Sequence, residues 1–564
     1  MSGAHLEPLI KSRTVLPRAP KNWHSWALIT IFFGLIAALV WSWLFIDMTL
    51  STVFGGFGDI WNLIQYMFPP IFDNFPEALR ATIETIWMAL IGTTMAVVLS
   101  VPLAFLAAQN TSPHPLVMAI SRGIISLARA VPALVLAAIF ASSVGIGPLP
   151  GVLALGLHSI GMIGKLFTEA IENTEATSRD AVVSTGAGKW QTVLATIVPQ
   201  IMPSSIGTSL YRLDINLRES AVLGFVGAGG IGFLIWSELR GLDYQRAISA
   251  VSVIFVAITL IELISVRLRT SIIGDHLSST PKQTPRKLAR VARDQKKIYV
   301  AITSRQLTLP WTQERVLQAT VGGTYLLLMI VALATIDMPL LSLYKLGDDV
   351  VLGIGRLFPP DFTTARSELI KGILETIAIG FVATALGLLI AIPLGILTAR
   401  NIIIRRLVAI LTRGMLLFIR GIPELIFAVI FVAAMGLGPV PGTLALAIAT
   451  ATFMAKLIGD ALEEVQQAPR DGVSAVGASR LQEFISAVLP QALPNLVSQL
   501  LYMLDVNLRS STVLGIVGGG GIGFLLISAI RGFETETVGA IVLLIFVIVY
   551  AIELLGSFVR RIVE

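Results

Sequence analysis

The sequence predicts an all-α integral membrane protein with about twelve transmembrane helices, arranged as two parallel six-helix repeats. Composition is the first reason. Of the 564 residues, 55% are hydrophobic and only 13% are charged, and the mean hydropathy is +0.82. Such a chain has too little polar surface to cover a soluble globule.

Internal similarity is the second reason. An offset of 291 residues superimposes the two halves, for example Glu84 on Glu375, with no gap over roughly 170 residues. Further pairs at this offset are Pro102 and Pro393, Asn110 and Asn401, Arg129 and Arg420, Pro132 and Pro423, Lys165 and Lys456, Asp180 and Asp471, and Arg218 and Arg509. We therefore expect residues 26–268 and 317–564 to be two copies of one membrane domain.

The first repeat follows a polar tail, residues 1–25, that carries several Lys and Arg residues. An apolar stretch at about 26–45 is long enough to span a bilayer, and no small-residue cleavage site follows it, so an uncleaved span is predicted. The next loop, to about Glu77, contains acids and no Lys or Arg, and we expect it to face outward. Further spans are predicted at about 80–107, 117–143, 150–171, 195–217 and 246–267.

The second repeat is predicted to have spans at about 317–336, 371–398, 408–434, 441–462, 486–508 and 537–558. Residues 269–316 between the repeats are rich in Lys and Arg and contain Ser-Ser-Thr-Pro at 278–281, which disfavours a continuous helix. This stretch is predicted to be a cytoplasmic linker, either a solvated tether or a contact for anionic lipid headgroups. The distribution of Arg then puts both termini in the cytoplasm.

Two polar segments interrupt the apolar pattern at equivalent places, residues 176–190 and 467–481. Each places an Asp six residues before a Gly, Asp180 before Gly186 and Asp471 before Gly477. An acid in a first helical turn is favoured by the helix dipole, and a glycine can adopt the left-handed conformation that ends a helix. We expect a short, stiff helix on the membrane surface that fits a groove on a partner; the alternative is an ordinary polar loop between two spans.

The two segments resemble the cytoplasmic coupling loop of binding-protein-dependent ABC importer permeases. The family pattern is Glu-Ala-Ala, three residues, Gly, nine residues, Ile, one residue, Leu-Pro. Both copies carry Asp in place of Glu, and Gly472 stands where the first copy has Ala181. The resemblance implies a type I importer permease fold and a cytoplasmic ABC ATP-binding subunit, in two copies, that holds both segments.

ATP and Mg would then belong to that partner, and no cofactor is expected in this chain. Gly188-Lys189 is the nearest match to a phosphate-binding loop, but it lacks the required glycine five residues earlier and the Ser or Thr after the lysine. The chain itself is predicted not to be an enzyme. With no cysteine it has no thiolate metal site, and no metal-ligand cluster is expected.

A glycine-rich stretch follows each fifth span. Its glycines are Gly227, Gly229, Gly230 and Gly232 in the first repeat and Gly518, Gly520, Gly521 and Gly523 in the second. Both stretches match the Gly-x-Gly-x-x-Gly dinucleotide fingerprint, but that fingerprint is meaningful only between a strand and a helix of a βαβ unit. We expect instead a tight bend, free of side chains, at the outer mouth of a pore.

The sequence before and through these glycines is similar to phosphonate permeases of the PhnE type. The shared run is Asn-x-Arg-x-(Ser/Ala)-x-Val-Leu-Gly-x-Val-Gly-x-Gly-Gly-Ile-Gly, which starts at Asn216 and again at Asn507. Methionine-importer permeases share a looser form of it. The resemblance implies uptake of phosphonate or a related phosphorus oxyanion, delivered by an extracytoplasmic phosphonate-binding protein.

Six residues are candidates for a substrate pathway: Arg218, Arg509, Asn216, Asn507, Arg129 and Arg420. A charge near the bilayer centre costs about 2.5–3.5 kcal/mol, so such arginines normally face a bundle interior or water. Guanidinium groups match phosphonate oxygens, and the asparagines could add neutral donors. The alternative is structural pairing of Arg218 with Asp214, and of Arg509 with Asp505, one helical turn back.

These observations predict a multi-pass permease in the plasma membrane of a prokaryote, in contact with lipid and not with nucleic acid. The net charge of +6 does not indicate nucleic-acid binding, because the basic residues lie beside apolar segments. Two other functions remain open. One is an ABC permease for methionine or another small metabolite, and the other is an ion-coupled secondary transporter with six plus six spans.

Overall fold

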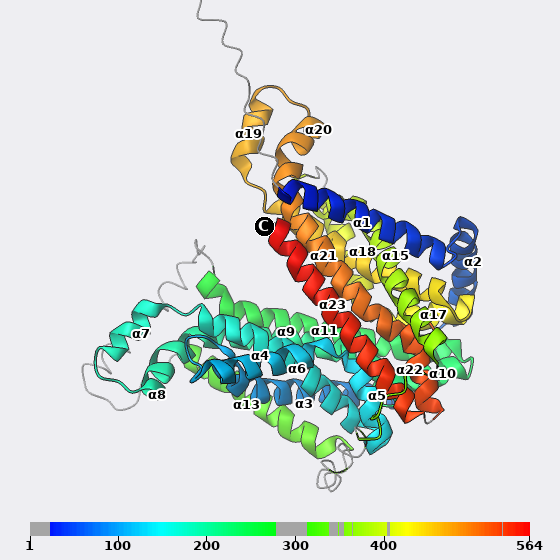
Figure 1. Ribbon diagram of the computed structural model, residues 1–564, viewed down its shortest axis with the longest axis horizontal. Helices are drawn as coiled ribbons and strands as arrows, with labels where there is room; N and C mark the ends of the chain where they lie inside the picture. The colour runs from blue at the N-terminus through cyan, green and yellow to red at the C-terminus, as the bar shows by residue number, and fades with distance from the viewer. Residues whose placement is uncertain are drawn as a thin grey trace, which may run out of the picture.

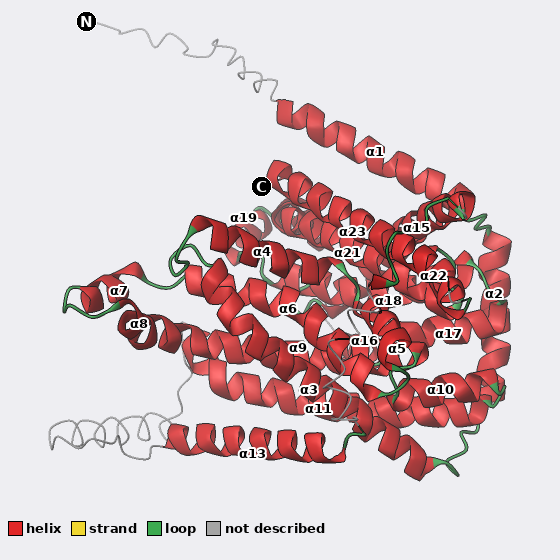
Figure 2. Cartoon of the chain, turned by 60° about the horizontal axis from the view of Figure 1, so that its bottom comes forward, coloured by secondary structure: helices red, strands yellow, loops and turns green. Residues whose placement is uncertain are grey.

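The fold is known from a computed structural model, which describes residues 23–277, 313–337, 348, 353, 355–363, 365–402, 406–532 and 534–563. Most of the predicted N-terminal tail and of the predicted linker lies outside the described residues. Within the described residues all regular structure is helical, as Figure 2 shows. The all-α fold is thereby confirmed.

The first repeat consists of eleven labelled helices and two short irregular turns. They are α1 (Trp23–Phe45), α2 (Leu50–Met67), α3 (Phe75–Ala107), α4 (Pro115–Ala130), α5 (Ala133–Val144), α6 (Pro148–Glu172), α7 (Ala176–Val183), α8 (Lys189–Thr192), a π-helical turn (Val193–Ile197), α9 (Val198–Leu223), a 3-10 turn (Gly224–Val226), α10 (Gly230–Arg240) and α11 (Tyr244–Leu277).

The second repeat follows the same order along the chain. It comprises α13 (Gln313–Thr335), α15 (Arg366–Thr398), α16 (Arg406–Arg420), α17 (Glu424–Met435), α18 (Pro439–Glu463), α19 (Gln467–Ala475), α20 (Arg480–Glu483), a π-helical turn (Phe484–Val488), α21 (Leu489–Leu514), a 3-10 turn (Gly515–Val517), α22 (Ile522–Arg531) and α23 (Thr535–Val563). Even the irregular turns recur at equivalent positions, so the two copies share one local structure.

The number of spans agrees with the sequence pattern. Seven described helices are long and apolar enough to cross a membrane, and two bent helix pairs bring the total to nine. Three shorter apolar helices, Phe33–Phe45, Ala319–Thr335 and Thr535–Ala551, lie where the three remaining spans are predicted. The loop predicted after the first span is in part a helix, α2, which starts at a capping box formed by Thr49 and Thr52.

The third span of each repeat is broken. Residues 117–143 and 408–434 are each predicted as one span, but α4 and α5 meet at 85° and α16 and α17 meet at 76°. The breaks lie at Pro132 and Pro423, which precede the first residues of α5 and α17. Proline disfavours helical conformation in the residue before it, so the chain turns there.

Each repeat has its own hydrophobic core around the ends of its spans nearest α7 and α19, and the two cores are built from equivalent residues. The first contains Ile163, Phe167, Ile171, Ile197 and Ile201. The second contains Met454, Ile458, Leu462, Val488 and Ala492, each 291 residues later in the chain. A shared pattern of burial therefore accompanies the shared pattern of sequence.

The first helix of each repeat packs on the other repeat. α1 lies along α15, and α13 lies along α3, as Figure 1 shows at opposite edges of the molecule. The sequence boundaries at 26–268 and 317–564 divide the chain into copies, but the packed bodies exchange their first spans. This exchange adds to the contact between the copies.

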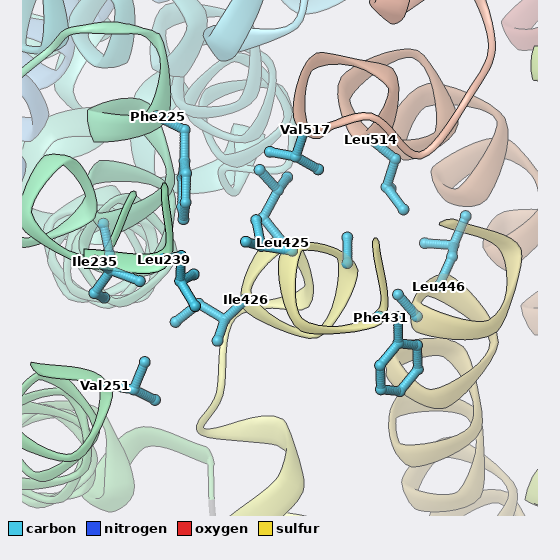
Figure 3. Close-up of a cluster of buried hydrophobic side chains, with 14 of the residues drawn as sticks. Phe225, Ile235, Leu239, Val251, Leu425, Ile426, Phe431, Leu446, Leu514 and Val517 are labelled. Atoms are coloured by element: carbon cyan, nitrogen blue, oxygen red, sulfur yellow. The ribbon is translucent and has the colours of Figure 1, made fainter. Parts of the chain in front are cut away.

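A third core joins the repeats. Figure 3 shows Phe225, Ile235 and Leu239 of the first repeat facing Leu425 and Ile426 of α17, and the same cluster continues to Phe431, Leu446, Leu514 and Val517. α17 thus packs on α2 of the first repeat and on α18 of its own repeat, and its side chains share one cluster with those of α10 and α11. The break before α17 is consequently held at the centre of the molecule.

Candidate functional site

The two predicted coupling segments are short helical pairs at one end of the bundle. α7 and α8 cover the segment at 176–190, and α19 and α20 cover the segment at 467–481. Figure 1 shows both pairs projecting beyond the spans, and none of the residues of α7 and α19 is buried. Gly186 and Gly477 have φ angles of 83° and 82°, the left-handed conformation expected where these short helices end.

Both segments expose large apolar side chains at equivalent positions. Trp190 and Leu481 are one such pair, and Leu194 and Ile485 are another. Trp190 is 75% exposed and Leu481 is 67% exposed. Exposed apolar side chains of this kind, beside the polar Asp180 or Asp471, are typical of a surface that is covered by a protein partner.

The glycine-rich stretches form the tight bends that the sequence predicts, at the other end of the bundle from α7 and α19 (Figure 1). Gly227, Gly229 and Gly230 have positive φ angles, as do Gly518, Gly520 and Gly521. Gly232 and Gly523 instead lie against the backbone, where an added Cβ would collide with the carbonyl oxygens of Ala221 and Thr512, respectively.

Glu84 has a structural role beside the first bend. Its Oε1 accepts a hydrogen bond from the Gly230 amide at 3.1 Å, and the Thr85 hydroxyl accepts one from the Ile231 amide at 2.9 Å. These contacts satisfy backbone donors that a helix start leaves unpaired, here at the start of α10. Thr376 does the same for Ile522 at 2.8 Å in the second repeat.

A cavity of about 600 Å³ lies between the repeats. Its wall is formed by α5, α6, α9 and α11 of the first repeat and by α16, α17, α18 and α21 of the second. The charged and titratable residues in this wall are His158, Asp214, Arg218, Glu219, Glu262, Arg420, Glu424, Lys456 and Arg509, with Tyr211 and Tyr502. A cavity of this size suits a small ligand.

One carboxylate in the cavity wall joins the two repeats. Glu262 on α11 accepts hydrogen bonds from Arg218 on α9 at 2.7 Å and from Arg420 on α16 at 2.8 Å. Each arginine uses one terminal nitrogen for this pair. Arg218 therefore pairs with Glu262 of its own repeat, and Arg420 of the second repeat adds a contact to the same carboxylate that crosses between the copies.

Arg509 follows the predicted structural pairing more closely. Its terminal nitrogen lies 3.4 Å from Asp505, one helical turn earlier on α21. The Nε atoms of Arg218, Arg420 and Arg509 are all buried and have no hydrogen-bond partner among the described residues. Three guanidinium groups thus line one cavity, and each has a buried Nε without a partner among the described residues, although buried donors of this kind normally have one.

The predicted asparagines hold helices together. Asn216 donates to the Thr93 hydroxyl at 2.8 Å and accepts from Ser159 at 3.0 Å. In the second repeat the partners of Asn507 are Thr384 and Thr450, at the same two distances. Both amides are buried, and each makes one donated and one accepted bond between helices, so a contact of either with substrate stays a prediction.

The structure separates the six predicted pathway residues. Arg218, Arg420, Arg509 and Asn507 line the cavity, whereas Asn216 and Arg129 do not. The backbone of Arg129 packs directly on Gly161 of α6, at the end of α4. Only three of the four predicted arginines therefore meet at the cavity.

Sequence reasoning missed several acids of this site, including Glu219, Glu262 and Glu424. Glu219 forms an ion pair with Arg212 at 3.0 Å, and Arg212 also donates to Ser159. A signal was present, because each acid lies within a strongly apolar stretch, where an ionisable residue suggests function. Glu262 also has a sequence counterpart, Glu553, whose side chain lies outside the described residues. Lys456 on α18 also lines the cavity.

The repeated spans, the coupling helices and the shared central cavity define a transport permease built from two fused membrane domains. The family model described as "Binding-protein-dependent transport system inner membrane component" matches residues 100–273 and again residues 391–564. The two matches start 291 residues apart, which is the offset of the internal repeat. The chain belongs to this family.

Curated relatives extend over most of the chain. The phosphate-import permease protein PhnE of Mycolicibacterium smegmatis is 44% identical over 93% of this chain and 92% of its own length. The phosphite transport system permease protein PtxC of Stutzerimonas stutzeri is 40% identical over 44% of this chain and 89% of its own length. A probable D-methionine permease, MetI of Haemophilus influenzae, is 31% identical over 31% of this chain. PtxC therefore corresponds to about one repeat.

Family membership settles the class of function. The chain is a multi-pass membrane permease component of an ABC importer, it is not itself catalytic, and it works with an ABC ATPase and a substrate-binding protein. The ion-coupled secondary transporter considered from the topology is therefore set aside. The tandem fusion predicted from the 291-residue offset is confirmed by the two family matches.

Proposed function

We propose that this chain forms the translocation pathway of an ATP-driven importer for phosphorus oxyanions. The observation that carries the proposal is the convergence of Arg218, Arg420 and Arg509 on one cavity, each with an Nε donor that lacks a partner among the described residues. The printed names of the relatives, which refer to phosphate and phosphite, agree with this cargo.

The chemistry of the cavity suits an oxyanion. A guanidinium offers donors in a planar fork that matches two oxygens of a phosphate-like group. Two broken helices, α5 and α17, also begin in the cavity wall, at Ala133 and Glu424. The start of a helix carries unpaired amide donors and a partial positive charge, and discontinuous membrane helices commonly present such ends to anionic substrates.

Transport would be driven from the coupling helices. Two ATP-binding subunits, with Mg and ATP bound between them and not in this chain, would cover the exposed apolar side chains of α7–α8 and α19–α20. Their closure would rock the repeats about the central cavity. An extracytoplasmic binding protein would deliver the anion at the opposite end, beside the glycine bends, with the coupling helices and both termini in the cytoplasm.

The test is ligand-stimulated ATPase activity of the full chain in lipid, with its ATP-binding and substrate-binding partners. Phosphate, phosphite, methylphosphonate and methionine are compared for the wild type and for the double variant Gly186→Pro with Gly477→Pro. Each proline would remove an amide donor that now bonds to Val183 or Ser474, and its φ cannot be positive.

We expect phosphorus oxyanions to stimulate the wild type and the double variant to lose this stimulation while it still assembles. Stimulation by methionine alone would show that the proposed cargo is wrong, whereas the assignment as an ATP-driven importer would stand. Full stimulation of the assembled double variant would overturn the assignment of the coupling helices. Substitution of Gly123 and Gly414 by Ala on α4 and α16 is the matched control, since neither has a neighbour within 4 Å of an added Cβ.

A further inference from the structure

Glu424 is a carboxylate of the cavity wall that no cation neutralises. It is the first residue of α17, and Ser510 of α21 lines the same cavity. Among the described residues no Lys or Arg lies within 4.0 Å of its oxygens, although Arg420 and Arg509 line the same cavity. An acid within an apolar span and without an ion pair suggests function.

Two other acids of the cavity differ from Glu424 in this respect. Glu219 is paired with Arg212, which is only 5% exposed, and Glu262 is paired with Arg218 and Arg420. Their charges are therefore balanced within the protein. The carboxylate of Glu424 keeps lone pairs that face a cavity, where they can accept a hydrogen bond from a ligand.

The fold does not require an acid at this position. The helix dipole favours an acid in a first turn, which gives Glu424 a possible structural role. The equivalent residue in the first repeat, however, is Ala133, and α5 starts there after the equivalent proline and has the same length as α17, 12 residues. The broken helix therefore forms with or without the carboxylate. The presence of an acid at position 424 needs another explanation.

We propose that Glu424 accepts a hydrogen bond from the P–OH group of the transported oxyanion and thereby selects protonated phosphorus oxyanions, such as hydrogenphosphate, over sulfate. This proposal rests on the proposed function. Three arginines cannot make that choice, because hydrogenphosphate and sulfate are both tetrahedral dianions that accept hydrogen bonds equally well. The two ions differ in one proton, and a carboxylate distinguishes them.

The physical reason is the absence of a donor on sulfate. Hydrogenphosphate can present its hydroxyl to Glu424 and its remaining oxygens to the arginines. Sulfate would place bare oxygens against a carboxylate, which adds repulsion and leaves the acceptor unpaired. Hydrogen bonds to charged groups are worth enough to give roughly 10- to 100-fold discrimination, and sites built to bond a substrate hydroxyl reject analogues that lack it.

The experiment measures binding of radiolabelled inorganic phosphate to the full chain in lipid nanodiscs, with sulfate as competitor. The substrate-binding protein is left out, because its own selectivity would hide that of the cavity. The variants are Glu424→Gln, which keeps the shape and adds a donor for sulfate, and Glu424→Ala, which copies Ala133 of the first repeat. Ser510→Ala is the matched control, since it removes a hydroxyl from the same cavity wall and keeps the carboxylate.

We expect sulfate to compete poorly in the wild type and in Ser510→Ala, and to compete roughly 10- to 100-fold better in Glu424→Gln. An unchanged ratio of sulfate to phosphate affinity in both Glu424 variants, with phosphate still bound, would overturn the proposal and leave the proposed function standing. If the wild type binds methionine and no phosphorus oxyanion, the proposed function fails and this proposal with it.

A second hydrogen-bond donor must be distinguished from P–OH. An ammonium group on a substrate such as 2-aminoethylphosphonate could also approach Glu424. Methylphosphonate has no ammonium, so the two phosphonates are compared as competitors of labelled phosphate. An equal loss of affinity for both phosphonates in Glu424→Ala supports recognition of P–OH. A loss of affinity confined to aminoethylphosphonate would overturn the proposal in favour of an ammonium site.

Discussion

The two repeats share a scaffold and differ in their charges. The asparagine networks around Asn216 and Asn507 have hydroxyl partners at equivalent positions and the same distances, and the glycine bends have nearly the same φ angles. In the cavity, by contrast, the equivalent residues differ: His158 corresponds to Ala449, Glu219 to Ser510, and Ala133 to Glu424. Two identical subunits could not place a single carboxylate of this kind, and the fused chain can.

The coupling helices show the same contrast. In the second repeat Arg470 pairs with Glu483 at 2.7 Å and donates to the Asn401 carbonyl, which ties α19 to the body. In the first repeat the residue equivalent to Glu483 is Thr192, and Arg179 reaches only its neighbour Asp180, at 3.6 Å. Fusion therefore permits one braced and one looser helical pair.

The largest expected effect tests the shared scaffold. Gly232→Ala and Gly523→Ala should each destabilise the protein by about 3 kcal/mol or more, because the new Cβ meets a backbone carbonyl that cannot move aside. The yield and thermal stability of the folded chain in lipid measure this. Gly123→Ala and Gly414→Ala serve as controls and should be neutral or slightly stabilising. A large cost in one repeat alone would contradict a common scaffold.

The next effect compares the ion pairs of Arg218 and Arg509, which occupy equivalent positions in the two repeats. Glu262→Gln should cost about 1.5–3 kcal/mol, since it weakens two charged hydrogen bonds, of which the one from Arg420 crosses between the repeats. Asp505→Asn should cost less than about 1 kcal/mol, since it weakens one longer pair within a helix. Thermal unfolding of both variants gives the comparison. Similar shifts would show that the contact between the repeats adds little.

A smaller effect concerns the brace of the second coupling helix. Arg470→Ala should loosen α19 by about 1–2 kcal/mol, because its ion pair is mostly buried, with Arg470 12% exposed. Arg179→Ala should change α7 by less than about 0.5 kcal/mol. Amide hydrogen exchange of α7 and α19 in the full chain measures both. Equal exchange changes in the two helices would remove the proposed asymmetry.

The smallest effect is at an exposed pair found in the first repeat. Arg246 donates two hydrogen bonds to Asp73, and this contact holds the pKa of the Asp73 carboxyl below its usual 3.8. In the second repeat the residue equivalent to Arg246 is Thr537, and the residue equivalent to Asp73 is also a threonine, at 363 or 364. These residues cannot form an ion pair. Because the folded pKa is lowered, the pair stabilises the protein above the usual pKa of Asp and stops doing so as pH falls through the lowered value.

Asp73→Asn should accordingly lower the unfolding temperature slightly at neutral pH, and the difference from wild type should vanish in strong acid. The midpoint is followed as a function of pH for both proteins. A difference that persists below the lowered pKa would assign the effect to the shape of the side chain and not to its charge.

Several features could be predicted from the sequence because each depends on short-range rules. Composition fixed the membrane class, the 291-residue offset fixed the repeat, and glycine at positions of positive φ marked both the coupling helices and the bends. The glycines that end the short helices at 176–190 and 467–481 follow from a local rule, since Gly186 and Gly477 adopt positive φ angles. The acid expected in a first helical turn was wrong, because neither α7 nor α19 has an acid in its first turn or a side-chain cap. None of these features depends on contacts between residues that are far apart in the sequence.

The site itself was decided by tertiary structure. Whether Arg218 pairs with Asp214 or with Glu262 depends on where α11 packs, and Glu262 reaches Arg420 only because the repeats meet at the cavity. Asn216 was expected to be a donor to substrate, but the approach of α3 and α6 buries it. The exchange of α1 and α13 between the copies is likewise a matter of packing. Sequence symmetry treats both copies alike, whereas burial and charge pairing between distant residues make them different.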